Sequence, residues 1–453
     1  MASALPPSKK GRKFHHKSRY GCLQCKQRRT KCDETRPTCS NCAQRGLDCS
    51  LRNFEPSSSL QLTTTTRRRS VPSAPLLGWI AASISPIGAG PSFCRSNTRD
   101  LELYCHYQAY TAGSLYHQAA FGDIYREELP RLATSYPFVG HGILSMAYVH
   151  LATLSPTPPG PLLAEAAFHV NQALPDYQEA LKEITERNSA ALFAFATLVV
   201  LFTLANVNEE CSVLLRTARH NPSKRAEACR GLSNSAARVI LAHHNIFGIF
   251  WQCQRWIASG PLAPLIQRYS PPMLSEPSMS WIRVEDAHLA MLSRLWENNP
   301  AIPRAQSWLL SDALNSLRDT FAMVTQLTHL PSSGHHDSET GFTNPDLATI
   351  HRKLSAGRLD DLPSVFTWFI RLSPAFVSMV EEGNLYAMVV LAHFAILLSR
   401  VCFGKWWMHQ LPRHFVEIAA LVLGEERREW IKWPLALVST GSSQVIRSSE
   451  SYT

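Results

Sequence analysis

The chain's 453 residues are 45% hydrophobic and 18% charged, enough for one large domain with a buried core and a small module beside it. Its formal net charge is +10, and residues 1–52 hold thirteen of the 45 basic and three of the 35 acidic residues. All of the excess charge therefore lies in the first ninth of the chain. This asymmetry excludes a uniformly basic protein and indicates an arm or module that binds a polyanion.

Composition divides the chain into five segments. Residues 1–20 are predicted to form a basic disordered arm, and residues 21–52 a cysteine-rich module. Residues 53–97 are rich in Ser, Thr, Pro and Gly without apolar periodicity, which predicts a flexible linker. A helical domain over residues 98–438 and a disordered tail over residues 439–453 complete the chain.

The cysteine module reads GCLQCKQRRTKCDETRPTCSNCAQRGLDC from residue 21 to residue 49. Adding 17 to the numbers of the first three cysteines gives those of the last three, which predicts two similar half-modules related by a pseudo-twofold axis. The N-terminal residues lack the apolar segment of a secretory signal, so the cysteines are predicted to bind metal rather than to form disulfides. The six candidate ligands are Cys22, Cys25, Cys32, Cys39, Cys42 and Cys49.

The number of thiolates limits the metal content of this module. Zinc prefers four tetrahedral ligands, and six thiolates cannot form two separate four-ligand sites. The count leaves one zinc with two spare thiols, or two zincs that share two bridging thiolates. The internal repeat favours the two-zinc cluster. Such a short module is predicted to unfold without its metal, because it buries little apolar surface.

This cysteine pattern, with the basic run KQRRTKC and the loop proline Pro37, resembles the fungal zinc binuclear cluster, a DNA-binding module of transcription regulators. The resemblance implies that Cys22 and Cys39 bridge the two metals. It further implies that Cys25 and Cys32 complete one zinc site, and that the other is completed by the last two cysteines of the module.

The charge of the two half-modules predicts which one faces double-stranded DNA. Lys26, Arg28, Arg29 and Lys31 lie between the second and third cysteines, whereas Arg45 alone lies between the last two. A short helix that starts near the second cysteine is expected to enter the major groove, and the resemblance implies a CGG-like triplet. Arg29 is the expected base contact, because arginine pairs bidentately with guanine. The other three residues are expected to contact phosphates and fix the register, and the alternative for them is a solvated basic face.

Residues 98–438 carry helical periodicity and almost no alternating β pattern, which predicts a mostly α protein with a large all-α domain. The apolar run at residues 190–207 is predicted to be a core helix rather than a membrane span, and residues 411–422 an amphipathic helix. Residues 216–236 are polar without a clear stripe and weaken this picture, and residues 331–345 are expected to form a loop.

Parts of this domain are similar to the regulatory domain of sterol-uptake-control regulators. The similar stretches are residues 130–152 (PRLATSYPFVGHGILSMAYVHLA), 256–266 (WIASGPLAPLI) and 387–398 (AMVVLAHFAILL), followed by the tryptophans of WW and WIKWPL. The resemblance implies a regulator that senses a lipid or one that controls a specialised-metabolite pathway. Apolar helices rich in Trp and Phe are more often simply core.

The sequence predicts a nuclear regulator of RNA polymerase II genes rather than an enzyme, because phosphate-cradling Gly-rich loops, zinc-protease motifs and nucleophile elbows are absent. The basic arm fits a nuclear localisation signal, and family tendency favours an activator that contacts the transcription machinery. No coiled-coil heptads follow the cysteine module, so a monomer and a homodimer both stay open. The alternatives are a protein whose main activity is lipid binding, and a nonfunctional chain whose 216–236 stretch prevents folding.

Overall fold

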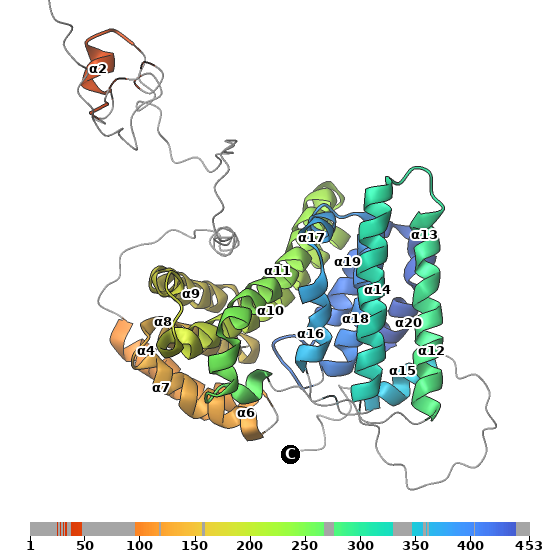
Figure 1. The fold of residues 1–453 in the computed structure, drawn as a ribbon. Helices are drawn as coiled ribbons and strands as arrows, with labels where there is room; N and C mark the ends of the chain where they lie inside the picture. Colours follow the sequence, from red (N-terminus) through yellow and green to blue (C-terminus); the bar gives the residue numbers. More distant parts are fainter. Residues whose placement is uncertain are drawn as a thin grey trace, which may run out of the picture. The chain divides into compact units, whose positions relative to one another are not determined.

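The computed structural model describes residues 25, 28, 30, 32–33, 38–47, 96–116, 119–155, 159–266, 276–328, 347–356, 359, 362–402 and 404–440. The chain divides into two compact units, residues 1–74 and 75–453. The mostly α fold class is confirmed, because the described residues form helices and no strand (Figure 1). The basic arm, nearly all of the linker, the loop at 331–345 and the tail beyond residue 440 lie outside the described residues.

The helices of the second unit begin at Ser96 and end at Thr440, against a predicted domain of residues 98–438. The first group comprises α4 (Ser96–His106), η1 (Tyr107–Thr111), α5 (Ala112–Ser114), α6 (Ala119–Asp123), η2 (Ile124–Glu128), α7 (Leu129–Ala133), α8 (Pro137–Leu154) and α9 (Gly160–Leu181). A long hairpin follows, formed by α10 (Glu186–His220), η3 (Pro222–Lys224) and α11 (Arg225–Ala258), with η4 (Ala263–Ile266) after it.

The remaining helices pack around α18 and α14 (Figure 1). They are α12 (Glu276–Ala290), η5 (Met291–Ser293), α13 (Arg294–Glu297), α14 (Arg304–Leu327), α15 (Leu347–Ala356), α16 (Leu362–Arg371), α17 (Pro374–Glu381), α18 (Leu385–Val401), α19 (Leu411–Leu423), η6 (Glu425–Ile431) and α20 (Lys432–Thr440). The predicted amphipathic helix at 411–422 is α19, whose Leu411, Phe415 and Ile418 are buried.

The α10–α11 hairpin corrects the expectation for residues 216–236. That stretch is the end of α10, a turn and the start of α11, and it is helical on both sides of the turn. Its buried positions are Ala218 on α10 and Ala228, Leu232, Ser233, Ser235 and Ala236 on α11. Most of these buried side chains are small, so the two helices can approach closely. Small side chains add little hydropathy, which is why the buried face of this stretch does not stand out in the sequence. The structure therefore does not support the alternative in which residues 216–236 prevent the chain from folding.

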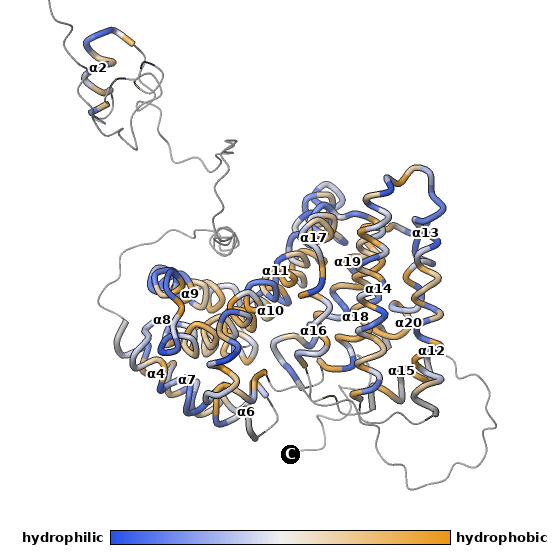
Figure 2. Tube along the Cα trace, in the orientation of Figure 1, coloured by the Kyte–Doolittle hydropathy of each residue, from blue (hydrophilic) through white to orange (hydrophobic). Residues whose placement is uncertain are grey.

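Helix α10 begins with a capping box and carries the predicted core run. The Thr185 hydroxyl accepts from the Asn188 N–H at 3.4 Å, and the Asn188 side-chain oxygen accepts from the Thr185 N–H at 2.8 Å. These bonds satisfy backbone donors at the helix start. Downstream, α10 packs against α8 and α11, and Figure 2 shows the hydrophobic residues along it.

Among the described residues, α10 is the single helix long and apolar enough to cross a membrane, and α17 with α18 passes the same test as a pair bent by 99°. In α10, 78% of the apolar window is buried inside the protein, as predicted for a core helix. The bend between α17 and α18 occurs at Gly383, whose φ of +72° is a conformation that favours glycine.

An ion pair is buried where α12, α14 and α18 meet. The side chains of Arg400 and Glu285 are 0% and 1% exposed, and the guanidinium donates to the carboxylate. The Thr325 hydroxyl donates to the second carboxylate oxygen at 2.8 Å, and Phe321 lies 5.3 Å from the guanidinium carbon. Burial of both charges is tolerated because each has a partner of opposite sign and further polar contacts.

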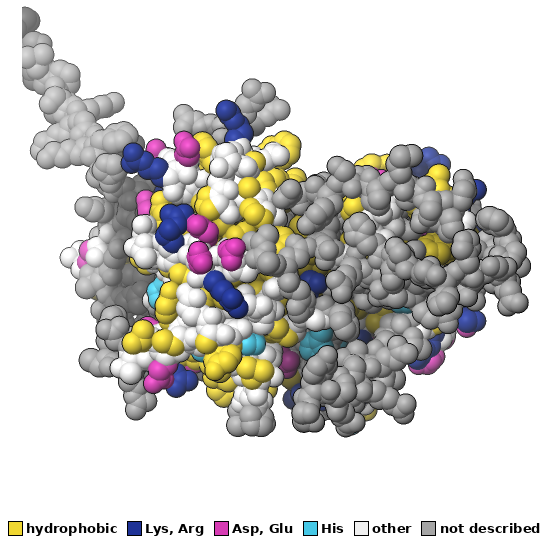
Figure 3. Space-filling model, turned by 90° about the horizontal axis from the view of Figure 1, so that it is seen from below, with side chains coloured by type: hydrophobic (Ala, Val, Ile, Leu, Met, Phe, Trp, Pro, Cys, Tyr) yellow, Lys and Arg dark blue, Asp and Glu magenta, His cyan; other side chains and the backbone are white. Residues whose placement is uncertain are grey.

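The outer surface of the second unit carries both signs of charge. Figure 3 shows basic and acidic side chains beside one another on the described surface seen from below, with hydrophobic side chains between them. This mixture agrees with the charge balance of the sequence, which places the net positive charge in residues 1–52. The described face in this view thus shows no extended basic area of the kind that binds nucleic acid.

Candidate metal centre and nucleic-acid interface

Three of the six predicted ligands converge in the first unit. The sulfur atoms of Cys25, Cys32 and Cys39 all lie within 4.8 Å of one another, and the three side chains are at most 2% exposed. Cys42 is equally buried and belongs to the same cluster, against which Leu47 packs. Cys22 and Cys49 lie outside the described residues.

The distance between two of these sulfurs suits a shared zinc ion. The Sγ atoms of Cys25 and Cys39 are 3.7 Å apart, far longer than the ~2.05 Å of a disulfide bond. Two thiolates on one tetrahedral zinc, with Zn–S bonds of about 2.3 Å, lie about 3.8 Å apart. The thiols present therefore fit the metal, and a fourth thiolate is required to close the site.

The 17-residue repeat is visible in the backbone. The N–H of Thr30 donates to the carbonyl of Cys25 at 3.0 Å, and the N–H of Leu47 donates to the carbonyl of Cys42 at 3.0 Å. The two donors differ by 17 positions and so do the two acceptors, so the same backbone hydrogen bond recurs in each half-module. In the second half-module this turn closes α2 (Ser40–Ala43), which starts directly after Cys39.

A carboxylate links the two half-modules. Asp33, next to Cys32, accepts hydrogen bonds from the Ser40 N–H at 3.2 and 3.1 Å and also from the Ser40 hydroxyl. The N-cap residue of α2, Cys39, makes no side-chain cap bond, so Asp33 supplies the acceptor at this helix start. These hydrogen bonds join the residue after Cys32 to the residue after Cys39.

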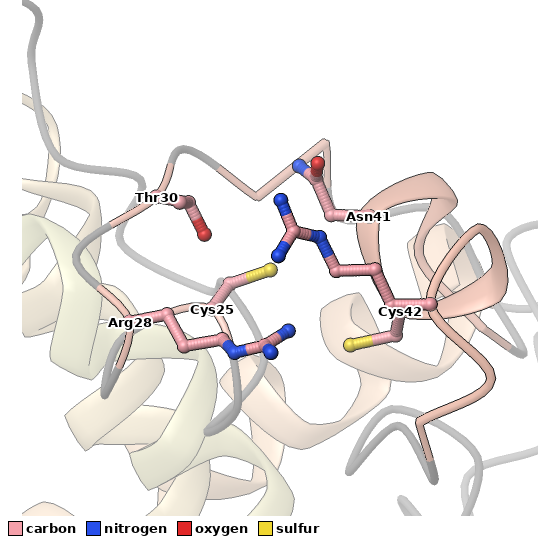
Figure 4. Close-up of a pocket in the computed structure, with 6 residues that line it drawn as sticks. Cys25, Arg28, Thr30, Asn41 and Cys42 are labelled. Atoms are coloured by element: carbon pink, nitrogen blue, oxygen red, sulfur yellow. The ribbon is translucent and has the colours of Figure 1, made fainter.

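Two arginines related by the repeat line one cavity between the half-modules. Arg28 and Arg45 differ by 17 positions, and the cavity also contains Cys25, Cys42 and Asn41 in its wall. Figure 4 shows the sulfurs of the two cysteines and the guanidinium of Arg28 directed into the same space. Two Zn²⁺ ions held by six thiolates would carry a net charge of −2, and the two guanidinium groups would offset it.

The predicted DNA contacts are only partly within the described residues. Arg28 is described and exposed, as a phosphate contact must be, whereas Lys26, Arg29 and Lys31 lie outside. Sequence reasoning missed the two roles described above for Arg45 and for Asp33. The 17-residue repeat could have indicated the role of Arg45, because Arg45 is the repeat counterpart of Arg28.

Comparison with known proteins agrees with this geometry. Residues 20–58 match the model of the fungal Zn(2)-Cys(6) binuclear cluster domain. A Zn(2)-C6 fungal-type transcription factor of Gibberella zeae is 24% identical over 97% of this chain and 88% of its own length.

Two further relatives match over shorter lengths. The Zn(2)-C6 fungal-type transcription factor afumD of Aspergillus fumigatus is 27% identical over 39% of this chain and 44% of that protein. Sterol uptake control protein 2 of Saccharomyces cerevisiae is 30% identical over 35% of this chain and 18% of that protein.

Proposed function

We propose that this protein, a DNA-binding transcription regulator with a fungal Zn(2)-Cys(6) binuclear cluster domain, acts in the nucleus on CGG-like sites that control one specialised-metabolite pathway. The observation that supports it is the convergence of Cys25, Cys32 and Cys39 within a segment that alternates thiols with basic residues. The domain binds two zinc ions, and the protein is not an enzyme.

The metal acts by fixing the shape of the module. Zinc supplies cross-links that a segment of this size needs in order to fold. The residues that would hold the ions are the six cysteines, with Cys22 and Cys39 as bridges. Folding of the first half-module around its metal would project Lys26, Arg28, Arg29 and Lys31 from one short segment toward DNA.

Base and backbone contacts have different chemistry in this proposal. Arg29 would donate two parallel hydrogen bonds to O6 and N7 of one guanine, which selects the base. Lys26, Arg28 and Lys31 would contact phosphates and set the register without selecting a sequence. The difference in charge is what favours the first half-module as the one that faces DNA, because the second has Arg45 as its one basic residue between the last two cysteines.

The helical unit would carry regulation, with contacts to the transcription machinery and to a second copy of the chain. Many long-range helix contacts give it a core of its own, so it can respond to a signal as one body. A lipid ligand is the alternative signal. The observation that favours it is an apolar cavity in this unit.

Genome-wide chromatin occupancy of the tagged full-length protein tests the proposal, with a Cys22→Ala variant as control. We expect peaks gathered over one contiguous set of biosynthetic genes, enriched in CGG, that vanish in the variant. Peaks over scattered lipid-synthesis genes would replace the pathway with the lipid alternative. Peaks that survive Cys22→Ala would refute DNA binding through the cluster.

A further inference from the structure

The turn of the α10–α11 hairpin is strongly basic, and the proposed function does not use it. Residues 216–230, here called the basic turn, contain five Lys or Arg residues and one acidic residue, Glu227. The whole second unit, residues 75–453, holds 29 basic and 31 acidic residues, so the rest of it is acidic on balance. Figure 1 shows the turn at the end of the hairpin beside α17, and Figure 2 shows its hydrophilic residues. Positive charge in this unit is therefore concentrated at one turn.

Two of the five cations have acidic neighbours. The Arg219 guanidinium contacts a carboxylate oxygen of Glu417 at 2.8 Å, so its charge is balanced within the unit. Arg230 lies one turn before Ser233 on α11, and the chain just after Glu381 packs against that serine. These two arginines are therefore left out of the candidate surface.

The remaining three cations are Arg216, Lys224 and Arg225. Each is exposed, and none forms an ion pair with another residue that the structure describes. The Arg216 Nε–H donates to the carbonyl of Ser212 at 3.3 Å, which uses one of the five guanidinium donors. Exposed cations that lack a counter-charge attract anions from solution.

Hydrogen bonds and close packing make the basic turn rigid. Asn221 accepts from the Ser223 hydroxyl at its side-chain oxygen, at 2.7 Å, and from the Lys224 N–H at its carbonyl, at 3.1 Å. A Cβ atom at Gly231 would lie 3.1 Å from a methyl carbon of Leu214, so α10 and α11 pack closely next to the turn. Cations on a rigid turn lose less entropy on binding than cations on a mobile segment.

The composition of the turn favours a polyanion over a protein partner. Residues 219–227 read RHNPSKRAE and contain no large apolar side chain. The centres of protein–protein interfaces rely on large aromatic and other apolar anchors, which these residues do not supply. Charge without apolar anchors is typical of surfaces that contact a phosphate backbone.

DNA is the polyanion that this protein brings close to the turn. The zinc cluster domain binds DNA, and a duplex carries one negative charge per ~1.7 Å of its axis. Between Leu47 and Ser96 lie 48 residues, a length of chain that can extend to roughly 160 Å. Binding by the first unit therefore raises the effective concentration of duplex DNA around the second unit.

We propose that the basic turn, through Arg216, Lys224 and Arg225, contacts the phosphate backbone of the duplex that the zinc cluster binds. This second contact adds affinity and salt dependence without selecting bases. The inference rests on the DNA-binding function of the chain, but it is independent of the proposed CGG-like sites.

The test compares two double variants of the full-length protein that remove the same charge. Lys224→Gln with Arg225→Gln removes two cations of the turn. The matched control is Arg427→Gln with Arg428→Gln, which removes two exposed arginines that pair with their own glutamates on η6. Fluorescence anisotropy of a labelled duplex, longer than the site of the cluster, gives the slope of log affinity against log salt in a potassium chloride series.

The turn variant should lower that slope by about 1.8, because each lost phosphate contact removes about 0.9. The control should keep the wild-type slope. An unchanged slope in the turn variant would overturn the proposal. An equal decrease in both variants would also overturn it, because net charge alone would then explain the effect.

Single and competing measurements keep the test decisive. If the double variant of the turn fails to fold, Arg216→Gln lies on α10 before the turn and should lower the slope by about 0.9. Binding to polyglutamate that is lost in the turn variant, with an unchanged DNA slope, would assign the turn to an acidic protein segment and overturn the DNA contact.

The sequence dependence separates this inference from the proposed function. The turn variant should weaken binding to a CGG-containing duplex and to a scrambled one by the same factor, and a changed ratio would overturn the role of a sequence-independent contact. A wild-type protein that does not prefer CGG would refute the proposed sites, whereas the difference in slope between the two double variants would still decide the contact of the turn.

Discussion

The carboxylate of Asp33 accepts hydrogen bonds from the backbone and the hydroxyl of Ser40, and thereby ties the first half-module to the start of α2 in the second. Asp33→Ala should loosen zinc by roughly tenfold, because groups that orient metal ligands typically change affinity by about 10- to 100-fold. Competition with a colorimetric zinc chelator measures this. Asp33→Asn keeps one acceptor oxygen, so its zinc affinity should lie between those of the wild-type protein and Asp33→Ala. Unchanged zinc affinity in Asp33→Ala would show that the link is dispensable.

Arg28 and Arg45 form a matched pair, because the repeat places both in one cavity while only Arg28 lies in the proposed DNA-facing half. Arg28→Gln should weaken binding to all DNA sequences alike and lower the slope of log affinity against log salt by about 0.9. Arg45→Gln should leave that slope unchanged. Fluorescence anisotropy of labelled duplex DNA across a potassium chloride series measures this slope for each variant. Equal slopes in the two variants would contradict the proposal that the first half-module faces DNA.

Loss of a zinc ligand should leave the helical unit intact. All eleven tryptophans lie in residues 75–453, so tryptophan fluorescence reports that unit alone. Cys25→Ser should abolish specific DNA binding and zinc retention, with the thermal melting curve followed by tryptophan fluorescence unchanged. The reason is that the second unit has its own hydrophobic core. A melting curve that shifts with Cys25→Ser would show that the two units stabilise each other.

The buried pair of Arg400 and Glu285 predicts an asymmetric mutant cycle. Arg400→Met should lower the free energy of unfolding by about 3–5 kcal/mol, because it leaves a buried carboxylate without a counter-charge. The double variant Arg400→Met with Glu285→Leu should recover most of this loss. Urea denaturation followed by tryptophan fluorescence measures both. A double variant as unstable as the single one would mean that packing volume, not charge, governs the site.

Buried histidines predict a loss of stability in mild acid. Burial lowers the pKa of His243 and of His393 to about 4, below the ordinary 6.5. The unfolded chain therefore binds more protons between pH 6.5 and 4, and stability present above 6.5 is lost as the pH falls through this window. Each of the two should cost about 1.4 kcal/mol per pH unit there. Urea denaturation at pH 7.5 and 5.5 measures the slope, which His393→Phe should reduce.

Short-range chemistry explains why much of the site was predictable. The spacing of the cysteines, the 17-residue repeat and the basic residues between them are consecutive in the chain, and thiolate coordination is decided within that stretch. The mostly α class followed from helical periodicity for the same reason. The weak hydropathy of residues 216–236 misled this reasoning, since Ala218 and Ala228 pack well without a strong apolar signal.

Tertiary structure decided what depends on residues far apart in sequence. His243 and Phe366 meet at a centroid distance of 4.2 Å although 123 positions separate them, and Glu285 reaches Arg400 across 115 positions. No local pattern marks either partner, because each histidine or charged residue has many possible neighbours until the helices pack. The sequence by itself therefore determined the metal chemistry, the charge asymmetry and the helical class. Only the folded chain decided which buried polar groups found partners, like the Thr325 hydroxyl on Glu285, and which, like Nδ1 of His414, did not.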